Sequence, residues 1–284
     1  MIVLTGANGQ LGRAIAERLL HLPPSQLGVS VRDPAQAGWL AERGVRVRQG
    51  SFDDAASLRH AFEGAAQVLI ISSNTAGDAT VDQHRTAIEA AKAVGARRIL
   101  YTSHMGSHAS SLFAPMRDHA ATEALLETCG VPFTSLRNGF YATSAMMFVG
   151  RALEVGELAA AEDGPVSWTT HADLADAAVI ALTDEGRLHG LTPALTASSA
   201  LDLADLAAIA SEESGREIKR VVITDEKQRA GMLAAGVPKG RVELLMGMFA
   251  ASRKGEFAAV DPTLERLLGR PPQSMREVLR AKRY

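Results

Sequence analysis

The sequence predicts an α/β protein built on a doubly wound parallel sheet, with a smaller C-terminal lobe. Three observations lead to this prediction. Short apolar segments alternate with segments of helical periodicity through the first half of the chain. A glycine-rich turn separates the first strand from the first helix. The segment 68–71 is apolar throughout, as expected for a central strand that helices cover on both faces.

The predicted strands follow one another along the chain, and a helix fills each interval between them. The strands are expected at 1–5, 27–31, 45–48, 68–71, 98–102 and 131–136. The helices are expected from the glycine turn to about residue 20, and at 34–43, 53–62, 81–94 and 117–128. Leu11, Ile15 and Leu19 give the first helix a buried stripe at four-residue spacing, and Pro23 helps to end it.

After Arg137 the alternation ends, and the second half predicts a different arrangement. Helices are expected at 142–155, 172–182 and 201–214, a short strand at 218–224, and a last helix ending near residue 280. We therefore predict two parts, a sheet domain at 1–140 and a smaller substrate lobe at 141–284. The lobe would cover the carboxyl edge of the sheet, with a ligand crevice between the two.

The segment Gly6-Ala7-Asn8-Gly9-Gln10-Leu11-Gly12 follows the first strand and opens the first helix. Gly6 permits the tight turn, Gly9 lets the backbone approach phosphate oxygens, and Gly12 lets the helix pack close to the strand. Strand, glycine loop and helix in this order place backbone N–H groups and a helix N-terminus against a pyrophosphate. The loop therefore predicts a Rossmann-type dinucleotide site with these seven residues as contacts; the alternative is an ordinary strand-to-helix turn.

Arg32 ends the second strand, about 20 residues after Gly12, where Rossmann proteins contact the adenosine ribose. A guanidinium at this place pairs with a 2′-phosphate, whereas a carboxylate accepts from a free 2′-hydroxyl. The position therefore favours NADP(H) as the cofactor. Asp33 leaves NAD(H) open, because its carboxylate either contacts a ribose hydroxyl or begins the Asp33-Pro34 turn.

Residues that follow the other strands are further candidates, because ligands of open parallel sheets bind at the carboxyl ends of the strands. The predicted cofactor contacts of this kind are Phe52, Ser72, Ser73, Asn74, Ser103, Asn138, Gly139, Phe140 and Tyr141. Tyr141, Asn138 and His104 are also predicted to position the substrate, because each side chain can hydrogen-bond a substrate oxygen.

Motifs that the sequence lacks restrict the chemistry. Many short-chain reductases move a proton with a Tyr-x-x-x-Lys pair. The three tyrosines of this chain, none with a lysine four residues on, are Tyr101, Tyr141 and Tyr284. No Gly-x-Ser-x-Gly elbow is present, which disfavours a hydrolase. No metal site is predicted, because His104 and His108 lack a third ligand at suitable spacing. His119 is a candidate proton donor, although a packed or surface histidine is the preferred interpretation.

Composition disfavours two further classes of partner. The 284-residue chain has a formal net charge of −2, which gives no attraction to nucleic acid or to an acidic membrane surface. No apolar run reaches the length of a membrane span. Cys129 is the single cysteine, so no disulfide can form within the chain, which suits a reducing compartment. Because the first strand begins at residue 1, no signal peptide is expected, and we predict a cytoplasmic protein.

Hydride transfer to a quinone fits the missing proton-transfer pair. The electron-poor ring accepts hydride, and the product oxygen is a weak base that solvent can protonate, so positioning does most of the work. We therefore predict a small quinone-like acceptor as the partner. The sequence leaves a homodimer open.

Several segments together resemble a known family. They are Thr5 to Gly12, Val31-Arg32-Asp33-Pro34-Ala35, Ile70-Ile71-Ser72-Ser73, Gln83-His84-Arg85, Ala90-Ala91-Lys92-Ala93, Tyr101-Thr102-Ser103 and Leu136-Arg137-Asn138-Gly139-Phe140-Tyr141. In these segments the chain resembles the NmrA-like group of atypical short-chain dehydrogenases/reductases. Within that group it is most similar to the branch of NADPH-dependent quinone reductases and triphenylmethane-dye reductases.

The resemblance implies an NADP-binding Rossmann domain with a small C-terminal lobe. It implies cofactor contacts at Gly6 to Leu11, Arg32, Ser72 to Asn74 and Asn138 to Tyr141. It also implies a role near the nicotinamide or the substrate for 168–173, and so for Thr170 and His171. Gln36 and Ala37 depart from the family pattern, which often has a basic residue just after Pro34-Ala35.

Three functions are compatible with these observations. The first is an NAD(P)H-dependent oxidoreductase that passes hydride to a quinone or similar conjugated acceptor. The second is a non-catalytic NADP-binding redox sensor of the NmrA type, which would bind the dinucleotide and a protein partner. The third, a nucleotide-sugar or ether-type reductase, is disfavoured because no lysine occurs between Lys92 and Lys219.

Overall fold

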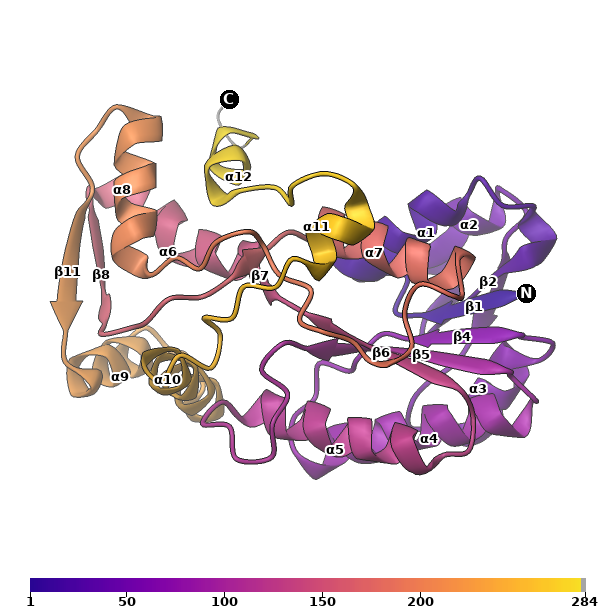
Figure 1. The fold of residues 1–284 in the computed structure, drawn as a ribbon. Helices are drawn as coiled ribbons and strands as arrows, with labels where there is room; N and C mark the ends of the chain where they lie inside the picture. Colours follow the sequence, from indigo (N-terminus) through magenta and orange to yellow (C-terminus); the bar gives the residue numbers. More distant parts are fainter. Residues whose placement is uncertain (282–284) are drawn as a thin grey trace.

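The computed structural model describes residues 1–281, and its centre is a seven-stranded sheet (Figure 1). The strands run in the order β10-β6-β5-β4-β1-β2-β3, and every pairing is parallel. Their bounds are β1 Ile2–Thr5, β2 Leu27–Val31, β3 Arg46–Gln49, β4 Gln67–Ile70, β5 Arg98–His104, β6 Phe133–Asn138 and β10 Gly190–Leu191. The order reverses between β1 and β4, which confirms the predicted doubly wound sheet. Tyr284 lies outside the described residues.

Helices cover both faces of this sheet. In Figure 1, α3, α4 and α5 lie below it, and α1 and α7 lie above it. The bounds are α1 Gln10–Leu19, α2 Gly38–Ala41, α3 Ala55–Phe62, α4 Asp78–Ala93, α5 Ala114–Thr128, α7 His171–Thr183 and α11 Thr263–Leu268, with short 3-10 helices η1 Pro24–Gln26 and η2 Pro34–Ala37. β1, β2 and β4 are buried along their whole length, as strands between two helical layers should be.

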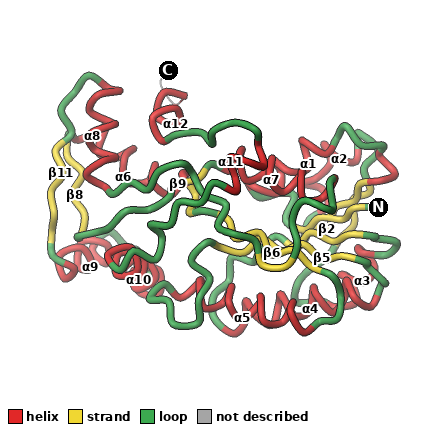
Figure 2. The backbone as a smooth tube through the Cα atoms, viewed as in Figure 1, coloured by secondary structure: helices red, strands yellow, loops and turns green. Residues whose placement is uncertain are grey.

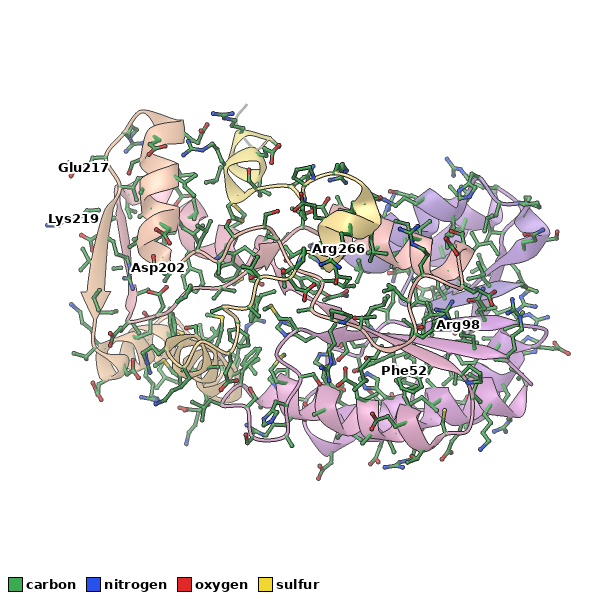
Figure 3. All side chains as sticks on the ribbon, in the orientation of Figure 1. Phe52, Arg98, Asp202, Glu217, Lys219 and Arg266 are labelled. Atoms are coloured by element: carbon green, nitrogen blue, oxygen red, sulfur yellow. The ribbon has the colours of Figure 1, made fainter. Side chains whose placement is uncertain are left out.

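A buried arginine joins the start of β5 to the segment between α7 and β10. Arg98 is 4% exposed and donates to the carbonyl oxygens of Ala181 and Leu188, each at 2.7 Å, and to Thr134 Oγ1 at 2.7 Å. These bonds replace most of the water that the guanidinium loses on burial, although Arg98 Nε has no hydrogen-bond partner within residues 1–281. Figure 3 shows Arg98 and Phe52 within the sheet domain.

The C-terminal lobe lies at one end of the sheet (Figure 2), around a separate apolar core. Its elements are α6 Ala142–Val155, β8 Glu157–Ala161, α8 Leu203–Ser214, β11 Lys219–Ile223, α9 Asp225–Ala234, α10 Lys239–Arg253 and α12 Met275–Ala281. β8 and β11 pair in parallel. Two short strands, β7 Phe140–Tyr141 and β9 Trp168–Thr169, pair where the chain leaves the sheet. Asp202, Glu217 and Lys219 mark the outer part of this lobe in Figure 3.

The two parts of the chain are interleaved. β10 pairs with β6 in the main sheet, and α7 packs against α1, so this part of the second half returns to the first. The division at residue 140 stays a prediction. The sequence did not predict β7, β8, β9, β10, α9, α10 or α11, and it predicted one helix at 34–43 where η2 and α2 stand. Within residues 1–281, no helix has the length and apolar character needed to cross a membrane.

Candidate functional site

The glycine loop after β1 leaves backbone N–H groups free at the start of α1. Gly9 is the N-cap, with extended backbone (φ −85°, ψ 167°), and no side chain caps the helix. The N–H groups of Gln10, Leu11 and Gly12 lie in the first turn, where no intrahelical acceptor exists. Since Gly9 and Gln10 are exposed, these donors and the helix dipole can meet an anion.

Two positions of the loop require glycine, each for a different structural reason. Gly6 has φ +66°, a conformation that side chains disfavour. A Cβ on Gly12 would lie 2.1 Å from the Gly6 carbonyl oxygen and 2.9 Å from the side chain of Ile71. Only glycine therefore lets α1 approach the end of β1 this closely, as the spacing predicted.

At the end of β2, the two candidate ribose-binding side chains differ in what they contact. The Asp33 carboxylate accepts from the Ala35 N–H at 3.1 Å and from Gln36 Nε2 at 3.0 Å, so it caps η2. Arg32 is exposed, and within residues 1–281 its guanidinium has no hydrogen bond or ion pair. Asp33 thus serves the turn, and Arg32 stays available for an anionic ligand.

The loops after β3 and β4 are tied to each other through Gln83 on α4. Gln83 Nε2 donates to Asp53 Oδ1 at 2.8 Å, and Gln83 Oε1 accepts from Ser73 Oγ at 2.6 Å. Phe52 lies half-buried beside these bonds and makes an edge contact with the His84 ring, 6.2 Å between centroids. Neighbouring Asn74 is exposed. The predicted contacts after β3 and β4 therefore lie in one region of the sheet edge.

At the ends of β5 and β6, four polar side chains come together. His104 and Asn138 are paired across the two strands, and the Asn138 side chain lies near the Tyr141 hydroxyl, where it acts to lower the pKa of Tyr141. The Tyr141 ring lies against His171 at the start of α7, 4.2 Å between centroids. We call His104, Asn138, Tyr141 and His171 the strand-end site. Asn138 Oδ1 and His171 Nδ1 are buried and have no partner within residues 1–281, which is typical of a site that a ligand or water completes.

Aromatic rings form one wall of the strand-end site. Phe140 lies 5.2 Å from the His104 ring, 5.0 Å from Phe257 and 5.4 Å from Trp168, between centroids. Phe257 comes from the segment after α10, so both parts of the chain supply this wall. Gly139 allows the chain to pass close to Thr169, because a Cβ at Gly139 would lie 2.1 Å from Thr169 Oγ1.

Hydrogen bonds fix the proton position on the histidines near this site. The Ser73 N–H donates to His84 Nε2 at 2.9 Å, so His84 carries its proton on Nδ1 and donates to Thr122 Oγ1, also at 2.9 Å. The Tyr101 hydroxyl lies 2.7 Å from His119 Nδ1 and 3.4 Å from His84 Nδ1. His84 Nδ1 is already a donor, so among the described residues His119 Nδ1 is the acceptor left for the Tyr101 hydroxyl proton, and Tyr101 donates to it. His119 therefore carries its proton on Nε2.

The same logic applies to His104. The Gly106 N–H donates to His104 Nδ1 at 3.1 Å, which leaves the proton on Nε2. Burial lowers the pKa of His104 to about 3 and that of His119 to about 4, so both imidazoles are neutral at physiological pH. Burial also raises the pKa of Tyr141, so its hydroxyl keeps its proton.

Burial lowers the pKa of His84 to about 3 from an ordinary value of 6.5, and this shift predicts a loss of stability in acid. The unfolded chain binds a proton at His84 below pH 6.5 while the folded chain does not, so stability falls as pH falls from 6.5 toward 3. Between pH 7 and 5.5 this single group accounts for about 1 kcal/mol. Urea unfolding of a His84→Gln variant should therefore show an acid loss smaller by that amount.

The matched control for this prediction is His60→Gln, because the His60 side chain is exposed. Its acid loss should equal that of the unsubstituted protein. Parallel curves for the protein and His84→Gln between pH 7 and 5.5 would show that His84 does not resist protonation in the fold. The window lies above the range in which carboxylates take up protons, so their titration does not interfere.

The glycine loop, the strand ends and the start of α7 all lie within the part of the chain that matches a known family. A family model described as NAD(P)H-binding matches residues 6–185. The chain belongs to this NAD(P)H-binding, NmrA-like family. Quinone oxidoreductase 2 of Escherichia coli is 36% identical over 279 residues, which cover 98% of this chain and 96% of that protein.

Two solved structures of family members superpose along almost the whole chain. The NADPH complex of the NADPH-dependent quinone oxidoreductase of Escherichia coli has a TM-score of 0.92 at 34% identity and covers 98% of both chains. The NADP(H) complex of the triphenylmethane reductase of a Citrobacter species has a TM-score of 0.91 at 31% identity and covers 99% of both chains. The predicted family and fold class are therefore confirmed.

The site residues predicted for this family member fall into three places. The glycine loop and Arg32 lie at the ends of β1 and β2, and Phe52 with Ser72 to Asn74 lies after β3 and β4. The strand-end site gathers His104, Asn138, Tyr141 and His171. Their contact with the cofactor stays a prediction. Two surface cavities, of about 290 and 460 Å³, are lined by none of the predicted site residues.

Two of the predicted residues also have clear structural roles. Ser103 Oγ donates to the buried Glu123 carboxylate at 2.8 Å. Thr170 caps α7 and donates to Asp173 Oδ2 at 2.7 Å. Asp173 is buried and forms an ion pair with Arg270 at 2.8 Å, which ties the C-terminal segment to the site. Sequence analysis proposed no role for Tyr101, Arg270 or Phe257, whose contacts join segments far apart in the chain.

Proposed function

We propose that the chain is an NADPH-dependent oxidoreductase that transfers hydride to a quinone or similar conjugated acceptor. The observation that carries the proposal is the uncharged, aromatic strand-end site, in a chain whose sequence lacks the tyrosine–lysine pair of many short-chain reductases. Its wall consists of Phe140, Phe257 and Trp168, and its polar groups are neutral imidazoles, an amide and a phenol. Such a site suits a flat conjugated acceptor.

The residues present fit the proposed cofactor. The free N–H groups at the start of α1 suit a pyrophosphate, and the Arg32 guanidinium, which has no partner in the described part of the chain, suits a 2′-phosphate. Asn138 and His171 offer buried unpaired atoms to a ligand at the strand-end site. NADPH, when bound, supplies the hydride. The relatives named as an NADPH-dependent quinone oxidoreductase and as a triphenylmethane reductase support this choice of cofactor and acceptor class.

The protein's own contribution to the reaction is then positioning. Tyr141 and Asn138 orient an acceptor oxygen by hydrogen bonding, and the aromatic wall keeps water from the reacting face. None of these groups has to exchange a proton, because solvent readily protonates the oxygen of the hydroquinone anion that hydride transfer produces. We place the protein in the cytoplasm, which its single cysteine favours.

A purified sample mixed with NADPH and a panel of small quinones tests the proposal. We expect nicotinamide absorbance to fall only when both protein and quinone are present. NADPH binding detected by fluorescence, with no quinone-dependent loss of absorbance, would instead favour the non-catalytic redox sensor. The same sample with a triarylmethyl dye in place of the quinone shows how wide the acceptor range is.

Changing Arg32 to Glu tests the cofactor preference. We expect the variant to bind NADPH at least about 10-fold more weakly, because it loses a charge-assisted hydrogen bond and gains repulsion. NADH binding should change much less. The matched control is Arg59→Glu, which alters an exposed arginine on α3 and changes the net charge equally. Titration by nicotinamide fluorescence measures both cofactors. An equal loss for NADPH and NADH would show that Arg32 does not contact the 2′-phosphate.

A further inference from the structure

Two half-buried imidazoles face each other beside the end of β5, and only one of them has a role in the proposed function. His104 and His119 have ring centroids 6.3 Å apart and ring planes inclined by only 25°. His119 lies on α5, the helix that carries the tyrosine–lysine pair in many related reductases. The inference that follows rests on the proposed function.

Both rings present the same group toward their surroundings. His104 Nδ1 accepts from the Gly106 N–H, and His119 Nδ1 lies at hydrogen-bond distance from the Tyr101 hydroxyl. Each ring therefore carries its proton on Nε2. In the part of the chain that the structure describes, neither Nε2 has a hydrogen-bond partner, and neither is enclosed from solvent. The protein thus holds two N–H donors in a fixed orientation with no internal acceptor.

We propose that the Nε2–H groups of His104 and His119 form a donor pair that binds the carbonyl oxygen of the acceptor. The two rings are neighbours, with centroids 6.3 Å apart, so both N–H groups lie within reach of one bound acceptor. Phe140 and Phe257 also contact the His104 ring, so the polar donors stand next to the aromatic part of the wall.

The donor pair gains strength as the reaction proceeds. A quinone that takes up hydride gains two electrons and one proton, and negative charge develops on the oxygen until solvent supplies the second proton. Fixed donors stabilise that charge more than they stabilise the neutral carbonyl. The two imidazoles lose no proton in this step. Burial raises the pKa of the Tyr101 phenol, so Tyr101 keeps its own proton. It fixes the tautomer of His119 and does not supply it with a proton.

If the donor pair acts in this way, its effect on the rate depends on the chemical class of the acceptor. An acceptor whose oxygen takes up negative charge needs the donor pair. A triarylmethyl cation accepts hydride at carbon and develops no oxyanion, so it gains nothing from the pair. We therefore assign to His119 a role specific to carbonyl acceptors, and to Tyr101 the role of a positioning residue.

The test compares the two acceptor classes in His119→Phe. We expect kcat with quinones to fall about 10- to 100-fold, in line with the loss of one oxyanion donor, while kcat with a triarylmethyl cation stays within about 2-fold. His119→Gln keeps an N–H donor and should recover part of the quinone activity. Tyr101→Phe should lower quinone activity less than His119→Phe. His108→Phe, on the exposed loop after β5, is the matched control and should change neither activity.

A second measurement does not depend on turnover. Nitrogen-15 shifts of the resting protein at pH 7 should show an unprotonated Nδ1 and a protonated Nε2 at both His104 and His119. A protonated Nδ1 at either ring would overturn the inference. So would an equal loss of activity with both acceptor classes in a folded His119→Phe protein. Failure of the proposed function looks different, because the unsubstituted protein would then fail to oxidise NADPH with either acceptor class, and both proposals would fall together.

Discussion

Replacing Glu123 by leucine is expected to lower the free energy of unfolding by about 3–5 kcal/mol. Glu123 is 3% exposed, and its carboxylate accepts five hydrogen bonds. The donors are Ser103 Oγ, Ser135 Oγ and Arg137 Nε to Oε1, and Ser107 Oγ and Arg137 Nη2 to Oε2, all at 2.7–3.0 Å. Leucine would leave the Arg137 guanidinium and three hydroxyls without their acceptor, and the unpaired charge is the largest of these losses.

Urea unfolding at pH 7 measures this loss directly, since the carboxylate is fully ionised there. Burial works against ionisation of Glu123, but the hydrogen bonds from Arg137, Ser103 and Ser107 outweigh it and hold the pKa below its ordinary value. The stabilisation is therefore present above the ordinary glutamate range and lost as pH falls through the lowered value. In strong acid the free energies of unfolding of the unsubstituted protein and of Glu123→Leu should converge.

Glu127→Leu is the matched control, because Glu127 lies one helical turn further along α5 and is exposed. Its effect should stay within about 0.5 kcal/mol. A loss of less than 1 kcal/mol in Glu123→Leu would mean that the serines and Arg137 find water or new partners, and that the network does not stabilise the junction of β5, β6 and α5.

The sheet was predictable because its strands and turns are encoded locally. Segments of strand length with apolar or alternating residues, and Pro23 or a glycine after each helix, mark β1 to β6 without reference to the rest of the chain. β10 could not be found in this way. It has only two residues, Gly190 and Leu191, and exists because they pair with Thr134 and Ser135 on β6. A strand fixed by a long-range pairing leaves no periodic signal.

The missed helices of the lobe have a similar explanation. α9 has no buried residue and begins Asp225-Glu226-Lys227, so no apolar stripe distinguishes it from a polar loop. α10 follows a Gly-Val-Pro segment and contains Gly240 and Gly247, which lower helix propensity. Gly247 is explained only by the fold, because a Cβ there would lie 2.9 Å from the Leu112 carbonyl oxygen.

In the candidate site too, some features are encoded locally and others depend on contacts between distant segments. The places of the glycine loop and Arg32, at the ends of β1 and β2, could be predicted because the spacing from the glycines to the end of the second strand is a property of the fold. The tautomer of His119 could not be, because it depends on Tyr101 and, through His84, on Ser73 and Thr122, which only the folded chain brings together. Sequence analysis preferred a packed or surface role for His119. The structure shows a half-buried ring with Nδ1 bonded and with no partner for Nε2 among residues 1–281.

Gly12→Ala is expected to weaken both the fold and NADPH binding, with affinity falling about 100-fold or more. The new Cβ would lie 2.1 Å from the Gly6 carbonyl oxygen and 2.7 Å from its carbonyl carbon, both backbone atoms that cannot rotate away. The start of α1 must therefore move from the end of β1, and the N–H groups that would hold the pyrophosphate move with it. Overpacking of this kind costs about 1–3 kcal/mol of stability. Thermal unfolding and nicotinamide fluorescence measure the two losses.

Gly9→Ala separates the two losses, because Gly9 has backbone angles that any residue adopts and its added Cβ would lie 3.4 Å from its nearest neighbour. Its stability without cofactor should match that of the unsubstituted protein to within about 0.5 kcal/mol. NADPH affinity should still fall, because the methyl group would stand where the backbone approaches the phosphate oxygens. Unchanged affinity in Gly9→Ala would place the pyrophosphate elsewhere along the sheet edge. Full affinity in a folded Gly12→Ala protein would show that the N-terminus of α1 does not hold it.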